Sequence, residues 1–233
     1  MKNLELQEAF ELEINQLDNN IEKPKTSDIE YWLNAGLDKF VKTRYSGLNY
    51  KQVGFEQNQK RIDDLRTLVK KYVKQFTVYP EEQIIELPSD YMFTLGETAF
   101  IASNDICWPI GPNGQPRKKQ TDVLEATIEN VDRQRSNSLS EFHLHGTHAR
   151  PLRLFEGNEI HLYNDGKYYV KEYCLTYLRQ PNKISLTAAP FEEYTDMPAA
   201  THLEIVKIAA ELYLENQANP RYQSYNNEVN TME

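Results

Sequence analysis

Three histidines lie within six residues of one another, at His143, His145 and His148. Neutral imidazole is a common zinc ligand, and three rings on one loop could converge on an ion. A zinc site also needs a fourth ligand and carboxylates that orient the rings. Glu141 is near, but no Asp or Cys follows at a motif spacing, and the chain has no HExxH pattern. We therefore expect no metal ion here. A metal-dependent or nucleic-acid-processing enzyme that uses these histidines is the alternative hypothesis.

The rest of the sequence has no pattern that predicts catalysis. It lacks the GxxxxGK[ST] loop that binds phosphates, the GxGxxG dinucleotide pattern and the GxSxG nucleophile turn. The acidic pairs Asp63-Asp64 and Glu192-Glu193 are expected on solvated surface, because carboxylates are rarely buried. We predict a protein that is not an enzyme, with no catalytic residue and no cofactor.

Charge and composition exclude further classes of protein. The chain has 233 residues, with 26 Lys and Arg against 35 Asp and Glu, a net charge of −9. Tight nucleic-acid binding is not expected, because affinity for phosphates comes from basic residues. No apolar run approaches the roughly 18 residues of a membrane span, and the acidic N-terminus is not a signal peptide. Cys107 and Cys174 are too few for a disulfide framework, so we expect two reduced thiols in an intracellular protein.

Three groups of residues are candidates for a protein interface, since Tyr and Arg are enriched there. One is a basic cluster in a loop rich in Pro and Gly at 105–120, one is a tyrosine face of a predicted strand, and one lies in the C-terminal tail. In that order the residues are Arg117, Lys118 and Lys119; Tyr169, Tyr173 and Tyr177; and Arg221, Tyr222 and Tyr225. A solvated loop tip and a sheet face packed on a helix are the ordinary alternatives for the first two groups.

Apolar residues at helical spacing predict helices at about 4–21, 27–44, 56–75 and 200–217. Two of them begin with a capping-box pattern, Ser27 with Glu30 and Thr201 with Glu204. Gly47 is expected to end the second helix. The closing helix is expected to bury Leu203, Val206, Ala210, Tyr213 and Leu214.

Strand composition occupies the middle of the chain, about 76–186. Strands are predicted at 91–102, 123–131, 152–157, 158–166 and 167–181. The Asp165-Gly166 dipeptide between alternating runs predicts a hairpin. In the last strand Tyr169, Tyr173 and Tyr177 are expected on one face.

Helices followed by strands and a closing helix predict an α+β fold. We expect a single α+β domain over 1–233, with a helical part at 1–75 plus 198–218 and a β part at 76–190. Residues 219–233 form a polar tail, expected to be mobile until a neighbouring subunit orders it. The 105–120 loop is expected to contact a different protein and not its own core.

Several stretches resemble the neck-ring proteins of tailed bacteriophages, the head-to-tail connector or adaptor subunits, and above all those of crAss-like phages. They are TSDIEYWLNAGLDKFVKTRYSG, LPSDYMFTLGETAFIAS, IHLYNDGKYYVKEYCLTYLRQPNKISL and THLEIVKIAAELYLENQANPRYQS. Together they lie within about 26–225. The "TYLRQP…ISL" run, followed by a capped helix ending in "NPRYQ", is the most specific part.

The resemblance implies a virion structural protein with an α-helical part and a β-sheet part. Such proteins form a ring, generally of twelve copies, beneath the portal, and DNA passes through the middle without specific binding. The implied partners are other copies of the chain, the portal and other neck or tail rings, with no membrane. The implied location is the virion neck or tail, with the host cytoplasm during assembly. A monomeric host adaptor is a third hypothesis.

Overall fold

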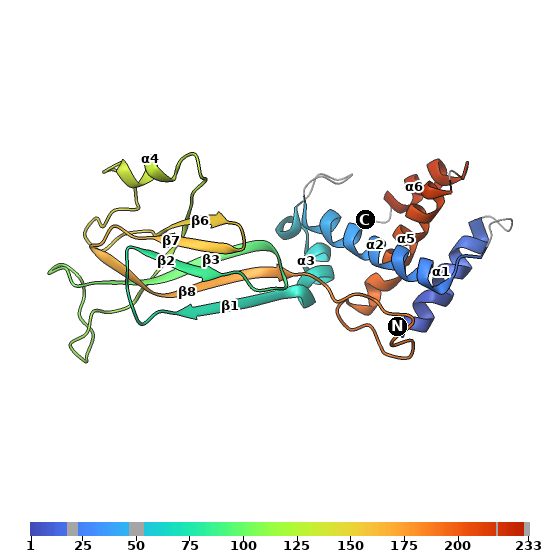
Figure 1. The fold of residues 1–233 in the computed structure, drawn as a ribbon, viewed down its shortest axis with the longest axis horizontal. Coiled ribbons are helices and arrows are strands. Elements are labelled where there is room, and N and C mark those ends of the chain that lie inside the picture. The colour runs from blue at the N-terminus through green and yellow to red at the C-terminus, as the bar shows by residue number, and fades with distance from the viewer. Residues whose placement is uncertain (18–22, 47–53, 218, 231–233) are drawn as a thin grey trace. The chain divides into compact units, whose positions relative to one another are not determined.

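A computed structural model of the chain describes residues 1–17, 23–46, 54–217 and 219–230. They form two compact units (Figure 1). A helical unit contains 1–68 and 181–233, and a β unit contains 69–180. The α+β class predicted from the sequence is confirmed. The single-domain prediction stays a prediction, but the boundaries of the two parts lie at 68/69 and 180/181 rather than near 75 and 190.

The helical unit is built from helices whose apolar stripes face one another. They are α1 (Asn3–Leu17), α2 (Thr26–Tyr45), α3 (Gln59–Leu65), α5 (His202–Asn216) and α6 (Tyr222–Asn230), with short 3₁₀ turns at Phe55–Gln57, Arg66–Leu68 and Ala199–Thr201. The predicted α2 stripe, Ile29, Leu33, Leu37, Phe40 and Val41, is fully buried. Gly36 lets α2 approach α5 closely: a Cβ built there would lie 2.9 Å from the Ala209 backbone nitrogen. Residues 18–21 and the Gly47 stop lie outside the described residues.

Both predicted capping boxes are wrong. The N-cap of α2 is Lys25, and the carboxylate of Glu30 instead accepts the backbone N–H of Leu186 at 2.9 Å and of Thr187 at 3.2 Å. At α5, Thr201 makes no side-chain cap bond, and its hydroxyl donates to the Pro198 carbonyl. Both glutamates are therefore used by tertiary contacts that outcompete the local bond.

Glu204 belongs to an ion-pair network that the sequence did not predict. Its carboxylate pairs with Arg44 and with Lys60, and Arg44 also pairs with Asp64 at 3.1 Å. The prediction that Asp64 lies on solvated surface is wrong, because Asp64 is only 6% exposed. Burial raises the pKa of the Asp64 carboxyl, although the positive charge of Arg44 lowers it in part. Glu192 and Glu193 are exposed as expected.

The predicted helix at 56–75 is wrong in its last third. The helical turns end at Leu68, and Val69–Gln75 is strand β1, antiparallel to 172–178. Leu65 and Leu68 are buried in the helical unit, whereas β1 gains a full ladder of backbone bonds from its neighbour. A helical pattern with weak local preference thus gives way to strand pairing.

The C-terminal tail also differs from the sequence-based expectation. Residues Tyr222–Asn230 form α6, which buries Tyr225 and Val229 against the helical unit. The Tyr225 hydroxyl donates to Glu13 of α1 at 2.9 Å. Leu203, expected in the α5 stripe, is instead 56% exposed, while Val206, Ala210, Tyr213 and Leu214 are buried as predicted.

The β unit is a sandwich of two four-stranded sheets (Figure 1). One has the order β1-β8-β3-β4 and the other β2-β7-β6-β5. The remaining strands are β2 (Glu82–Glu86), β3 (Tyr91–Ser103), β4 (Lys119–Asp122), β5 (Leu124–Glu125), β6 (Leu152–Glu156), β7 (Glu159–Tyr163) and β8 (Tyr168–Arg179). Apolar and aromatic side chains of both sheets fill the space between them, among them Ile85, Ile160, Leu162, Tyr173 and Leu175.

The Asp165-Gly166 turn exists, but it does not make a hairpin. Gly166 has a φ of 76°, as such a turn requires. The strand before it, β7, pairs with β2 and β6, whereas β8 after it pairs with β1 and β3. The turn therefore carries the chain from one sheet to the other.

Two further strand predictions are corrected. Within the predicted strand at 123–131, only Leu124–Glu125 is a strand. After it the Asn130 side chain accepts a hydrogen bond from the Thr127 N–H, and helix α4 (Val131–Ser136) begins at the next residue. In the pairing of β3 with β8, Phe100 lies opposite Glu172, but the next residue, Ile101, lies opposite Val170. One residue of β8 is therefore left without a partner in β3, and the register shifts. This irregularity reverses the alternation, so Tyr169 does not share a face with Tyr173 and Tyr177.

Among the described helices, none is both long enough and apolar enough to cross a membrane.

Candidate functional site

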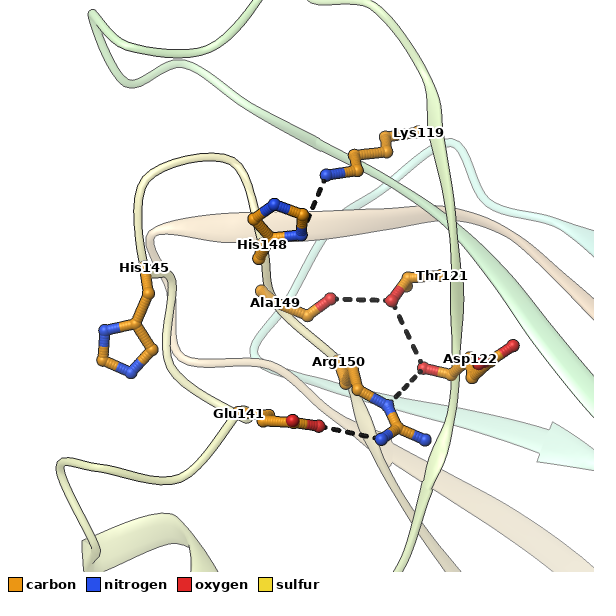
Figure 2. A pocket seen from close by; sticks show the side chains of 8 residues that line it. All are labelled: Lys119, Thr121, Asp122, Glu141, His145, His148, Ala149 and Arg150. Atoms are coloured by element: carbon orange, nitrogen blue, oxygen red, sulfur yellow. Dashed lines mark hydrogen bonds and ion pairs between the residues drawn. The ribbon is translucent and has the colours of Figure 1, made fainter.

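The three histidines lie on the loop between α4 and β6. His145 and His148 form a tight turn in which each backbone N–H bonds the other residue's carbonyl, at 2.9 and 3.1 Å. Both line a half-open pocket of about 390 Å³ that Figure 2 shows from close by. His143 faces a different pocket, beside Asp165. The residues around the first pocket are Lys119, Thr121, Asp122, Glu141, His145, His148, Ala149 and Arg150.

Each imidazole is bonded to a different partner. His143 Nε2 lies 3.1 Å from the Arg135 carbonyl, and His145 Nε2 lies 3.3 Å from the Ser140 carbonyl, so both nitrogens donate. His148 Nδ1 lies 3.2 Å from Lys119 Nζ, which can only donate. Figure 2 shows Lys119 pointing at the His148 ring, while the His145 ring lies on the other arm of the turn.

The structure therefore does not bring these histidines together as a metal site. His143 faces a different pocket from His145 and His148, so the three rings do not converge on one point. Across the described residues, no group of three or more His, Cys, Asp or Glu side chains is placed to hold a metal ion.

Two of the charged groups that line the first pocket, Lys119 and Arg150, already have partners. Lys119 Nζ donates to the Thr147 carbonyl at 2.7 Å, and Arg150 pairs with Glu141 at 2.8 Å. Thr121 donates its hydroxyl hydrogen to the Ala149 carbonyl, so it is not positioned against a base (Figure 2). The hydroxyl of Thr121 is thus bonded to backbone carbonyls and is not activated by a base.

The predicted basic cluster is divided among three environments. Lys119 belongs to the pocket, and Lys118 pairs with Glu172 at 3.4 Å. Arg117 is exposed, and its carbonyl accepts the Trp108 indole N–H at 2.9 Å. Of the three, Arg117 is the one whose charged group has neither an ionic nor a hydrogen-bonding partner among the described residues.

The expectation that the 105–120 loop avoids its own core is wrong at its base. Trp108 is 3% exposed and packs with Ile101, Tyr168 and Val170. Beyond it, Ile110 and Pro116 form a bridge closed by a turn in which Gly114 has a φ of 73°. The loop is anchored at one end and extends past the strands at the other (Figure 1).

Two isoleucines on this loop were missed by the sequence analysis. Ile106 is fully exposed and Ile110 is 72% exposed, on either side of the buried Trp108. The pattern that could have identified them is an isolated apolar residue in a loop rich in Pro and Gly. Single exposed apolar residues are common on protein surfaces, so Ile106 and Ile110 are candidates for a contact with another protein and do not form a patch by themselves.

The tyrosine face is mostly interior. Tyr173 is fully buried, and Tyr177 is 4% exposed and donates to Asp90 at 2.8 Å. Burial and this hydrogen bond raise the pKa of Tyr177 to about 12. Tyr169 is partly exposed and packs against Tyr79, with ring centroids 4.5 Å apart and ring planes tilted by 34°. Of the three, Tyr169 has the surface position that an interface requires.

The candidates in the tail are also split. Tyr225 is buried, and its burial together with Glu13 raises its pKa. Arg221 is exposed before α6, and Tyr222 is partly exposed and accepts from Asn226. Cys107 is exposed on the 105–120 loop and Cys174 is buried, and the two are not bonded to each other.

A comparison with known families finds one match, over residues 1–219. The matching family is described as phage tail ring protein 3/4. The match includes the β unit and the helical unit up to the start of α6. No curated protein matches the chain.

Proposed function

Because the chain belongs to the phage tail ring protein 3/4 family, we propose that it forms a ring in the phage neck that connects the capsid portal to the tail. The chain is a structural protein of a bacteriophage virion. The proposal adds the position next to the portal, a ring of twelve copies, DNA passage through the centre and assembly in the host cytoplasm. The observation that carries it is the family match through both compact units.

The surface of the loop supports a connecting role. Ile106, Ile110 and Arg117 are exposed on a loop that Trp108 fixes to the β unit. A rigidly anchored, apolar tip loses little conformational freedom when it docks on another protein. We propose that this tip contacts an adjacent ring, with Tyr169, Arg221 and Tyr222 as further contact candidates.

The mass of the assembled protein tests the ring. Twelve copies of the 27.3 kDa chain give 12 × 27.3, or about 328 kDa. Native mass spectrometry of the purified protein and electron microscopy of particles should show this species and a ring. A monomer that is absent from purified particles would overturn the proposal.

We propose further that the bore is net acidic or neutral, so that DNA slides through it. The support is the net charge of −9 per copy. A basic lining would hold DNA through many phosphate contacts. Assembled rings should bind duplex DNA weakly at neutral pH and roughly 0.15 M salt. Tight, salt-sensitive binding would contradict the idea, as would Lys and Arg outnumbering Asp and Glu along the bore.

The proposal includes no catalytic role. Its support is the bonding of each histidine to a separate partner. Metal analysis of the purified wild type and of a His143→Ala/His145→Ala/His148→Ala variant tests it. Stoichiometric zinc in the wild type and none in the variant would favour the enzyme hypothesis instead.

A further inference from the structure

Two described segments of the chain carry opposite charge without any mixture. Strand β1 has Lys70, Lys71 and Lys74 and no acidic residue. Helix α1 has no basic residue and four glutamates, Glu5, Glu8, Glu11 and Glu13. In a chain of net charge −9, β1 is therefore a local exception that attracts acidic surfaces.

Strand β1 is the outer strand of its sheet and, in the described structure, pairs only with β8. Its side chains alternate between two faces. Tyr72 faces the sandwich core, so Val69, Lys71 and Val73 face outward. Val69 and Val73 are 37% and 44% exposed, and Lys71 lies exposed between them. We call these three residues the β1 outer face.

Helix α1 presents a matching surface. Leu6, Phe10 and Ile14 are buried in the helical unit. Glu5, Glu8 and Leu12 lie on the opposite side of the helix, and Leu12 is 61% exposed one turn after Glu8. We call these three residues the α1 outer face. Each face thus combines exposed apolar side chains with charge, and the two charges have opposite sign.

We propose that the β1 outer face of one copy docks on the α1 outer face of the next copy. Leu12 packs against Val69 and Val73, while Lys71 faces Glu5 and Glu8. Lys74 lies on the other face of the same strand, opposite Tyr173, and adds to the local positive potential. The two faces are different, so the contact is head-to-tail, the kind that closes into a cyclic ring. The proposal rests on the ring function proposed above and names the surfaces that build the ring.

Charge complementarity supports a second copy as the occupant. Copies that each carry −9 repel one another, so assembly needs a local attraction that orients them. The β1 lysines and the α1 glutamates supply it within the same chain. An edge strand bearing lysines also resists uncontrolled strand pairing, which limits the partners that it accepts.

Charge reversal with mixing tests the contact. Variant A is Lys71→Glu/Lys74→Glu, and variant B is Glu5→Lys/Glu8→Lys. Each variant alone places like charges in the contact, so its ring fraction in native mass spectrometry should fall about tenfold or more. A chain with all four changes regains the attraction and has the wild-type net charge of −9. It should form rings again.

An equimolar mixture of A and B is the decisive sample. The acidic β1 of A then meets the basic α1 of B, and the basic β1 of B meets the acidic α1 of A. Alternating rings should form, which an even copy number such as twelve permits. A contact between β1 and α1 of the same chain would be restored only in the four-change variant, so rescue there without rescue in the mixture would overturn the proposal.

Matched controls separate this contact from bulk charge. Lys167→Glu/Lys183→Glu changes the net charge as variant A does, from −9 to −13, at exposed residues elsewhere. Glu129→Lys/Glu215→Lys does the same for variant B, giving −5. Both controls should form rings. If the wild type and variants A and B all form rings, the proposed contact is overturned and the ring function stands. If the wild type is a monomer, the ring function itself is overturned.

Discussion

A buried ion pair between the two sheets of the β unit should dominate that unit's response to mutation. Arg153 of β6 contacts Glu97 of β3 with two nitrogens, Nε at 3.0 Å and Nη2 at 2.8 Å. The two side chains are 7% and 6% exposed. Burial alone lowers the pKa of Arg153, but the hydrogen bond to Glu97 and its charge raise it further than burial lowers it. Arg153 is therefore a charged group inside the sandwich, held by a bidentate contact to Glu97.

Arg153→Met should destabilise the β unit by about 3–5 kcal/mol, because it leaves the Glu97 carboxylate buried without its partner. For a unit of this length, each kcal/mol lowers the melting temperature by roughly 4 °C, so we expect a loss of roughly 12–20 °C. The pair variant Arg153→Met/Glu97→Met removes both charges and should recover most of that loss.

Glu125 provides the matched control. It pairs with the same guanidinium at 3.2 Å, but its side chain is 74% exposed. Solvent screens such a contact, so Glu125→Gln should cost well under about 1 kcal/mol. The contrast between the two partners of Arg153 isolates burial as the cause.

The two tryptophans allow the β unit to be followed separately. Trp108 lies in the core of the β unit and Trp32 in α2 of the helical unit. In a Trp32→Phe background, urea unfolding monitored by fluorescence reports the β unit. Equal costs for Arg153→Met and Glu125→Gln, or no recovery in the pair variant, would refute the reasoning.

Three further predictions concern the helical unit, followed by Trp32 fluorescence in a Trp108→Phe background. Gly36→Ala should destabilise it by about 1–3 kcal/mol despite the better helix propensity of Ala, because the new methyl group meets the Ala209 backbone 2.9 Å away; an unchanged urea midpoint would contradict this. Burial lowers the pKa of His202, so the unfolded chain takes up a proton below about pH 6.5 that the folded unit resists. Stability should therefore fall as the pH drops through that value, and His202→Gln should remove this dependence. Tyr225→Ala should cost about 3 kcal/mol and truncation after Asn219 at least as much, since α6 buries that ring, and a truncated chain of wild-type stability would show that α6 is dispensable.

The sequence predicted what depends on long local patterns. The stripe of α2 and the order of helices and strands follow from apolar spacing, which reports burial directly. The predictions failed where a distant residue decides. Glu30 fits a capping box, but the N–H groups of Leu186 and Thr187 bind it. Val69–Gln75 fits a helix, but pairing with β8 makes it a strand.

The site predictions failed for related reasons. Tyr169 and Tyr173 are four residues apart, so strict alternation places them on one face, but the slip in the pairing of β3 with β8 separates them. The spacing of His143, His145 and His148 shows that they lie near one another in the chain. It does not show that one nitrogen of each ring already bonds a different group, or that His143 faces a different pocket from His145 and His148.

The chain passes from the helical unit into the β unit through β1 and leaves it after β8, and these two strands are neighbours in one sheet. Val69, where the unit begins, lies opposite Leu178, two residues before it ends, and antiparallel partners are roughly 5 Å apart. The whole of 69–180 is therefore a portable insert whose two ends sit side by side. Replacing the whole segment with another whose ends are equally close would need no change in the separation of residues 68 and 181. For the same reason, a hairpin of a few residues can bridge the gap and give a helical unit without its sandwich.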